Sequence, residues 1–262
     1  MVKKGIMHFY TFMIFFFLYA PIIVLIIFSF NESKSRGAFT GFTLKWYQDL
    51  FKNGEVIKAL SNTMIIAVLS TIVSTILGTL AAIGIHFSSG IFKKTVLNLN
   101  YLPILNPDVV IAVSLMALYR FMGLDFGMFT VFLSHVAFCT PYVVLSILPK
   151  LKQMNVHLAE AAMDLGAKPL YALRKVIIPE IMPGIITGAL MAFTLSVDDF
   201  VISFFTTGHG VQNLSILIFS MARRGINPVI NALSTFMLIG FFILLLIINK
   251  ISGKNGGEEE RY

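Results

Sequence analysis

Residues 160–179 read EAAMDLGAKPLYALRKVIIP, and they lie between two apolar stretches of membrane-spanning length, 126–148 and 181–205. Gly166 occupies a position suited to a left-handed helix C-cap. Pro169 suits the first turn of a following helix, because its missing N–H would have no intrahelical partner there. The first helix has an apolar face at three- and four-residue spacing, formed by Leu158, Ala161, Ala162 and Leu165. The pattern predicts two short helices joined by a glycine turn, lying in water between two spans.

The composition is that of an integral membrane protein. Hydrophobic residues make up 57% of the chain and charged residues 13%, which is too apolar for the surface of a soluble domain. A spanning helix needs about 20 mostly apolar residues. Six stretches meet this requirement, near 9–30, 63–87, 96–122, 126–148, 181–205 and 229–248. The sequence therefore predicts an all-α membrane protein with six spans.

The polar segments are too short to form a second domain, since the longest have about 30 residues and cannot bury a core. We expect one transmembrane domain over 1–262, with a two-helix loop at 150–180. The first span is longer than the apolar part of a signal peptide, and no small-residue cleavage site follows it, so we expect it to stay as an anchor. The single cysteine, Cys139, excludes an intramolecular disulfide.

Lys and Arg residues indicate the orientation in the membrane. An even number of spans puts both termini on one side, and 12 of the 20 Lys and Arg residues fall on that side, leaving eight on the other. Both termini and the loop at 150–180 are therefore predicted to be cytoplasmic. The net charge of +7 is explained by this topology, and no basic patch interleaved with aromatic residues suggests nucleic acid.

A segment outside the loop, in the third predicted span, has residues that disfavour a regular helix. The third span contains Pro103 and the run Asn106-Pro107-Asp108, so we expect it to be kinked or partly unwound. Irregular backbone at membrane depth needs protein or a water-filled cavity to satisfy its polar groups.

The first outer loop, 31–61, contains the only tryptophan, Trp46. Trp46 is either an interfacial anchor or a contact at the mouth of a substrate path.

The loop resembles the "EAA" loop of the permease subunits of bacterial ABC importers. That pattern has Glu-Ala-Ala, three residues, Gly, nine residues, Ile, one residue and Leu-Pro. Val176 replaces the Ile here and Ile178 replaces the Leu, which keeps the apolar character. The positions that match fully are Glu160, Ala161, Ala162, Gly166 and Pro179. The alternative from periodicity alone is an amphipathic helix lying on the membrane.

The resemblance implies a type I importer permease fold in the bacterial inner membrane. It implies a coupling loop that docks on a cytoplasmic ATPase, with Glu160 as a charged contact and Gly166 as the turn. The partners implied are a second permease subunit, two copies of an ATPase and an external binding protein. The chain has no Gly-Xaa4-Gly-Lys-Ser/Thr phosphate loop. We therefore expect a non-catalytic subunit that binds no cofactor or metal itself, with ATP and Mg²⁺ on the ATPases.

Ionisable residues within spans suggest the substrate, because such residues are costly there and mark a pathway or a buried pair. Asp198 and Asp199 fall in the fifth span, and Asp108 follows the break in the third. Ser196 and Asp199, three residues apart, can share a helix face. Unpaired carboxylates with a hydroxyl nearby favour an organic cation. The alternatives are interhelical hydrogen bonds, or an ion pair with Arg120, Arg223 or Arg224.

A narrower resemblance concerns the stretches 106–110 and 193–199 together with the Glu160 loop, which are similar to the second permease subunit of spermidine/putrescine importers. It implies a substrate path for polyamines, and both spermidine and putrescine fit it. The path residues that it implies are Asp108, Ser196, Asp198, Asp199 and Trp46. Aromatic side chains and separated carboxylates suit a chain of ammonium groups.

Other functions stay open at this point. A permease for another solute would carry the same loop, and an ion-coupled secondary transporter would carry similar acidic spans. An intramembrane aspartyl protease is disfavoured, because adjacent aspartates on one helix cannot share a proton. His135 and Cys139 lie four residues apart on the fourth span, but no third metal ligand accompanies them. We therefore expect these two residues to pack rather than to bind a metal.

Overall fold

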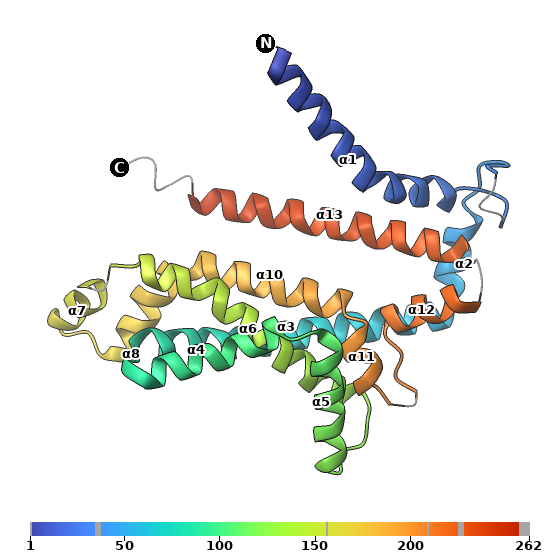
Figure 1. Ribbon diagram of the computed structural model, residues 1–262. Coiled ribbons are helices and arrows are strands. Elements are labelled where there is room, and N and C mark those ends of the chain that lie inside the picture. The colour runs from blue at the N-terminus through green and yellow to red at the C-terminus, as the bar shows by residue number, and fades with distance from the viewer. Residues whose placement is uncertain (1, 35–37, 156, 209, 225–227, 257–262) are drawn as a thin grey trace. The chain divides into compact units, whose positions relative to one another are not determined.

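The computed structural model describes residues 2–34, 38–155, 157–208, 210–224 and 228–256 (Figure 1). The described residues are helical apart from turns, loops and one isolated antiparallel bridge between Asn31 and Phe42. The all-α prediction is therefore confirmed. The chain divides into two compact units, Met1–Ile57 with Leu217–Tyr262, and Lys58–Ile216.

The first unit contains α1 (Val2–Ser29), α2 (Lys45–Lys52) and α13 (Pro228–Gly256), and both α1 and α2 contact α13. The rings of Phe51 and Phe236 meet edge to face at 5.5 Å. Most of the apolar side chains of α1 are exposed. A helix that is apolar on all sides, and that its own chain leaves uncovered, is expected to lie in lipid or against another subunit.

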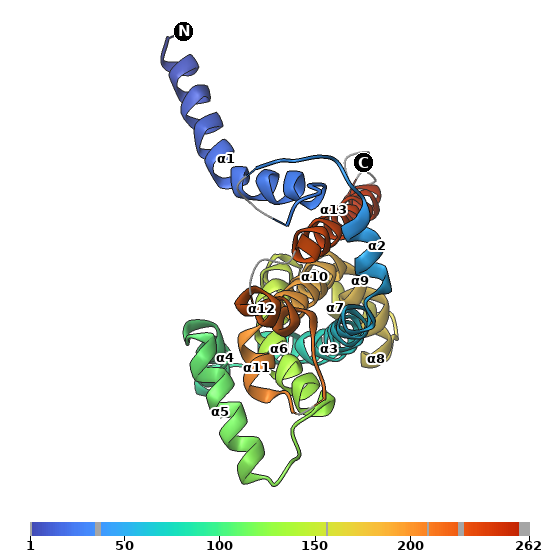
Figure 2. The same ribbon diagram turned by 90° about the vertical axis from the view of Figure 1, so that its right-hand side faces the viewer.

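The second unit is built around α6 (Met128–Gln153), with α3 (Gly54–Phe87) and α10 (Met182–Asp198) alongside it (Figures 1 and 2). α3 begins in the first unit and continues into the second. Val143, Ile147 and Leu151 of α6 are fully buried in the main apolar cluster. Their spacing of four residues keeps one face of α6 on this core.

Glycines of α10 allow this helix to approach α6 closely. A Cβ at Gly188 would lie 3.1 Å from Val143 Cγ1, and one at Gly184 would lie 3.1 Å from the carbonyl oxygen of Ser146. Small residues at helix contacts are the usual means of tight packing in membranes, where the hydrophobic effect does not drive helices together. The α6–α10 contact therefore depends on backbone proximity.

Gly78 of α3 makes a comparable contact, and it provides a test of the packing. A Cβ there would lie 2.6 Å from Val143 Cγ1, whereas a Cβ at Gly84 of the same helix would meet nothing within 4 Å. We expect Gly78→Ala to destabilise the folded protein by about 1–3 kcal/mol through overpacking. Gly84→Ala should be neutral or slightly stabilising, because alanine favours helix. Thermal unfolding in detergent measures both, and equal midpoints for the two variants would contradict the packing described here.

The predicted third span is broken. α4 (Gly90–Leu105) and α5 (Asp108–Phe121) meet at an angle of 107°. Asn106 has extended backbone dihedrals before Pro107, as the steric demand of proline requires. Pro103 is accommodated inside α4. The predicted kink is therefore confirmed, and the break lies at Asn106-Pro107.

Three helices in the described part of the chain are long and apolar enough to cross a membrane, Met7–Ser29, Gly54–Phe87 and Met128–Gln153. The bent pairs Gly90–Leu105 with Asp108–Phe121, and Pro169–Glu180 with Met182–Asp198, add up to two more. The shorter apolar helix Pro228–Ile243 occupies the place of the sixth predicted span. Six spans remain compatible with this arrangement.

Several boundaries differ from those expected. The helix of the second predicted span, α3, begins at Gly54 rather than near 63. Polar helix formers such as Glu55 and Lys58 extend it beyond the apolar stretch. α6 runs to Gln153, beyond the expected end at 148. The fifth apolar stretch is divided into α10 and α11 (Val201–Thr206), and α12 (Leu214–Arg224) follows. Apolar length alone locates the lipid-facing part of a helix and not its ends.

Candidate functional site

The predicted glycine turn is present. α7 (His157–Asp164) is followed by Gly166, whose φ of 88° lies in the left-handed region. The Gly166 N–H donates to the Met163 carbonyl, and the Ala167 N–H donates to the Ala162 carbonyl. These two bonds form a Schellman motif, which satisfies carbonyls at the helix end. The sequence prediction for Gly166 is therefore confirmed.

The second arm of the loop is continuous with the fifth apolar stretch. α8 (Pro169–Ala172) has proline in its first turn as predicted, and a π-helical turn (Leu173–Ile177) and α9 (Ile178–Glu180) follow. The chain then bends by 69° into α10. Ile177 and Ile181 are buried in the same apolar cluster as α6. A displacement of the loop can therefore pass directly to α10.

The tip of the loop presents apolar side chains to solvent. Leu165 is 90% exposed, and Leu170 and Tyr171 are also largely exposed. A cavity of about 560 Å³ lies at the turn, lined by Ala162, Leu165, Gly166, Ala167, Lys168 and Tyr171. Apolar side chains displayed at a polar turn indicate a protein contact.

Glu160 lies on the exposed side of α7. Its Oε2 is 3.0 Å from Nδ1 of His157, and both side chains are well exposed. An exposed pair of this kind adds little to stability. Glu160 therefore remains accessible to a charged group of a partner.

The three aspartates predicted for a substrate path lie in different environments. Asp108, at the start of α5, and Asp198, the last residue of α10, are exposed. No hydrogen bond or ion pair of either carboxylate is found within the described ranges. The side chain of Asp199, in contrast, is only 7% exposed.

Asp199 belongs to a buried polar network. Its Oδ2 lies 3.3 Å from Nε2 of His135, and Nδ1 of His135 lies 2.6 Å from Oγ of Ser196. Ser196 in turn lies 3.1 Å from Oγ of Ser70 on α3. The interpretation of Asp199 as an unpaired carboxylate is therefore wrong, since an imidazole from α6 reaches it. Ser196 and Asp199 do not share a helix face, because α10 ends at Asp198, but one histidine contacts both.

The expected packing of His135 and Cys139 is also found. Cys139 is fully buried, with Sγ 3.5 Å from the Ala192 carbonyl oxygen. The described part of the chain contains no cluster of three residues able to hold a metal ion. His135 packs as predicted, but its polar contacts with Ser196, Ser203 and Asp199 were not foreseen.

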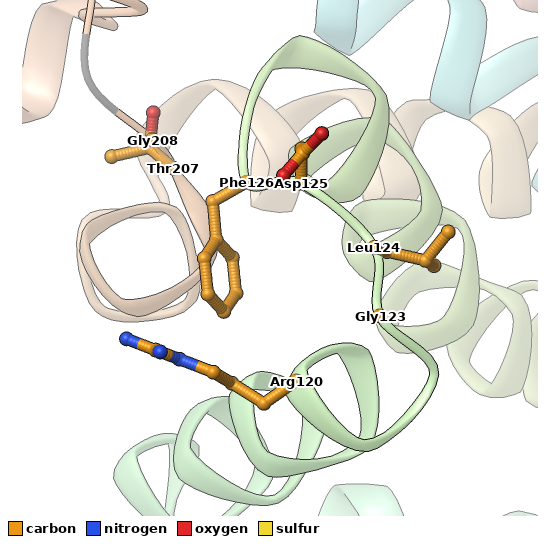
Figure 3. A pocket seen from close by; sticks show the side chains of 7 residues that line it. All are labelled: Arg120, Gly123, Leu124, Asp125, Phe126, Thr207 and Gly208. Carbon is orange, nitrogen blue, oxygen red and sulfur yellow. The ribbon is translucent and has the colours of Figure 1, made fainter.

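Arg120, one of the alternatives considered as an ion-pair partner, takes another role. Its guanidinium lies 5.6 Å from the ring centroid of Phe126, and Figure 3 shows the side chain reaching toward that ring. Among the described residues of its unit, no ion pair of Arg120 with a carboxylate is found. The surrounding cavity of about 700 Å³ is lined by Arg120, Gly123, Leu124, Asp125, Phe126, Thr207 and Gly208.

Trp46 lies in the first unit and is only 5% exposed. Its indole N–H donates to the carbonyl of Asn31 at 2.7 Å, while the Asn31 side chain bonds the backbone of Ala38 and Thr40. Lys45 lies over the indole ring at 5.7 Å. These contacts hold residues 31–34 and 38–46 together. The role of Trp46 in a substrate path stays a prediction.

Residues 74–254 match the family model described as "Binding-protein-dependent transport system inner membrane component". The matched range includes the Gly166 turn and the acidic segment at 196–199. This chain belongs to that family. It is thus an inner membrane component of a transport system, as the resemblance of the loop indicated, and not an enzyme.

Curated relatives of this inner membrane component cover nearly its whole length. The spermidine/putrescine transport system permease protein PotC of Haemophilus influenzae is 36% identical over 94% of this chain and 96% of its own. PotC of Escherichia coli is 37% identical over 89% and 88% of the two chains. The putrescine transport system permease protein PotI of Escherichia coli is 40% identical over 86% and 82%.

Solved structures show a similar fold. A chain of a bacterial ABC transporter that imports the acidic polysaccharide alginate aligns over 97% of both chains, with a TM-score of 0.76 and 18% identity. A chain of the MetNI methionine ABC transporter in an inward-facing conformation aligns over 74% of this chain and 93% of its own, with a TM-score of 0.63. The ABC importer permease fold is therefore shown for this inner membrane component.

Proposed function

We propose that this chain is a permease subunit of an ATP-driven importer that carries polyamines, spermidine or putrescine, across the bacterial inner membrane. The observation that carries the proposal is the 36–40% identity to permeases named for spermidine and putrescine, over most of each chain. Asp108 and Asp198 support it, because exposed carboxylates near a broken span favour cationic solutes. Ser196 and Asp199 are proposed to shape this path. A role for Trp46 in the passage of the solute is proposed separately.

The partners are proposed by analogy with the family. A second permease subunit forms a heterodimer with this chain, two copies of a cytoplasmic ATPase bind ATP and Mg²⁺, and an external binding protein delivers the polyamine. Both termini and the coupling loop face the cytoplasm. Lipid surrounds the exposed apolar helices, and no cofactor binds to this chain itself.

The mechanism uses the continuity between the coupling loop and α10. When the ATPases bind nucleotide and close, they displace the tip of the coupling loop, which is formed by α7 and α8. Ile177 and Ile181 lie in the core that α6 and α10 share, so the displacement moves α10, which carries Asp198 at its other end. The path then opens outward to the loaded binding protein, and hydrolysis returns it to the inward-facing state.

Reconstitution of the four components in proteoliposomes tests the proposal. Labelled spermidine or putrescine should enter only with ATP and binding protein present, and ATP hydrolysis should rise when the binding protein is loaded. Unlabelled polyamines should compete, whereas sulfate and neutral sugars should not. Uptake of a different solute class would replace polyamines as the cargo, and uptake without the ATPase would indicate an ion-coupled transporter.

A further inference from the structure

The fifth apolar stretch is interrupted where the acidic residues lie. α10 ends at Asp198, Asp199 has extended backbone dihedrals with ψ of 126°, and α11 begins at Val201. The Asp199 side chain caps the new helix: Oδ1 accepts from the Ile202 N–H at 3.0 Å, and Oδ2 accepts from the Ser203 N–H at 2.7 Å. Because the first N–H groups of a helix lack intrahelical partners, these bonds stabilise the start of α11.

His135 connects the two sides of this interruption. Nδ1 lies 2.6 Å from Oγ of Ser196, before the break, and Nε2 lies 3.0 Å from Oγ of Ser203, after it. His135, Ser196 and Ser203 are each at most 2% exposed. One imidazole of α6 therefore holds the end of α10, the capping carboxylate and the start of α11 in a single arrangement.

The chemistry of the groups determines which of them donate and which accept hydrogen bonds. A neutral imidazole donates through one nitrogen and accepts through the other, and an ionised carboxylate only accepts. Nε2 is therefore assigned the proton, which it donates to Oγ of Ser203 with the Asp199 carboxylate 3.3 Å away, and Nδ1 accepts from the Ser196 hydroxyl. Ser70 can then donate to Ser196 from α3. A network with every member satisfied is rigid, because any rotation leaves a buried polar group without a partner.

Asp198 is the neighbour that this network leaves free. It is exposed, and no described residue hydrogen-bonds to its carboxylate. Its direction is set by the end of α10 and by the turn at Asp199, to which it is covalently joined. The position of the exposed carboxylate therefore depends on how firmly the break is held.

We propose that His135 is a positioning residue for transport: by bridging Ser196, Asp199 and Ser203 it holds the α10–α11 break in the geometry that places Asp198. His135 touches no substrate in this role. The cationic nature of the transported solute rests on the proposed function, whereas the holding of the break does not. A histidine that only filled space would be replaceable by an apolar residue without local opening at the break.

The test compares the accessibility of two buried positions, one at the α10–α11 break and one in the α6–α10 contact. Ser203→Cys introduces a thiol at the break, and the native Cys139, also fully buried, reports loosening of the α6–α10 contact. The complete complex, with both permeases and the ATPases, is treated in detergent with a small hydrophilic thiosulfonate reagent. Labelling of each cysteine is followed by mass spectrometry. His135→Ala and His135→Gln are compared with His8→Ala, which removes an exposed imidazole of α1.

In the Ser203→Cys protein, both thiols should be protected. His135→Ala should raise labelling at position 203 about tenfold or more and leave Cys139 protected, and in an otherwise native chain it should lower the maximal uptake rate by a similar factor. His135→Gln can still donate and accept hydrogen bonds, so it should retain much of the protection at position 203 and much of the uptake rate. His8→Ala should change neither the labelling nor the uptake rate. If His135→Ala prevents assembly, Ser196→Ala, which deletes the Nδ1 partner, should give the same selective labelling.

Three results would overturn the proposal. Equal labelling of both cysteines would indicate general loosening, unchanged labelling at 203 would show that the break needs no histidine, and opening at 203 with normal uptake would remove any role in transport. Labelling does not depend on the transported solute. A complex that fails to import polyamines yet opens selectively at position 203 would therefore refute the proposed cargo and leave the holding role of His135 intact.

Discussion

Gly166→Val should abolish coupling between ATP hydrolysis and transport. Gly166 has φ of 88°, and a Cβ there would meet nothing within 4 Å, so the cost of substitution comes from the backbone alone. A left-handed residue with a side chain costs roughly 1–2 kcal/mol, and a β-branched one is a stronger outlier. The Schellman turn should therefore rearrange, and the exposed Leu165 beside it should leave its position. Uptake should fall about tenfold or more, and stimulation of the ATPase by loaded binding protein should be lost.

Gly166→Asn is the matched control, because asparagine tolerates left-handed dihedrals and occurs at this helix position. It should retain most of the uptake. Gly166→Val should unfold only a few degrees below Gly166→Asn, since residue 166 is exposed and touches no core residue. Equal loss of uptake in Gly166→Asn would show that the conformation of the turn is not what the function needs.

Asp198→Asn should reduce polyamine uptake by about 10- to 100-fold, because a hydrogen bond to a charged group contributes roughly 1.5–3 kcal/mol. The Asp198 carboxylate is exposed and has no partner among the described residues, so its replacement should leave assembly and thermal stability unchanged. Transport assays in proteoliposomes, with the subunit composition checked by size-exclusion chromatography, separate the two effects. Asp198→Glu keeps the charge and should retain partial activity.

Asp199→Asn provides the contrast within the same segment. It should also reduce uptake, but with a lowered unfolding temperature, since Asp199 caps α11 and meets the imidazole of His135. Normal polyamine uptake by the double variant Asp198→Asn, Asp199→Asn would remove the argument from these carboxylates to a cationic substrate.

The coupling loop was predictable because its determinants are local. A left-handed glycine, a proline in a first helical turn and an apolar face at helical spacing are set by residues within a few positions of one another. The break at Asn106-Pro107 was predictable for the same reason, since proline restricts the residue before it. Six long apolar stretches likewise followed from the thickness of the hydrocarbon core.

The partners of the acidic residues were not predictable, because they come from distant parts of the chain. His135 and Asp199 are 64 positions apart in the sequence, and they meet only because α6 and α10 pack closely at Gly184 and Gly188. One signal was present: His135 is the only histidine in the fourth predicted span, which contains no acidic residue, Lys or Arg. An ionisable group at that depth requires a polar partner.

The sequence alone determined the membrane location, the approximate spans, the helical hairpin at 157–180 and the presence of acidic residues in two spans. These follow from composition and from contacts between near neighbours. Only the tertiary structure decided which carboxylate is free and which is engaged, since adjacent Asp198 and Asp199 differ in exposure through the packing of α6 against α10 and α11. Burial and pairing arise from the meeting of separate helices, and no local pattern encodes that meeting.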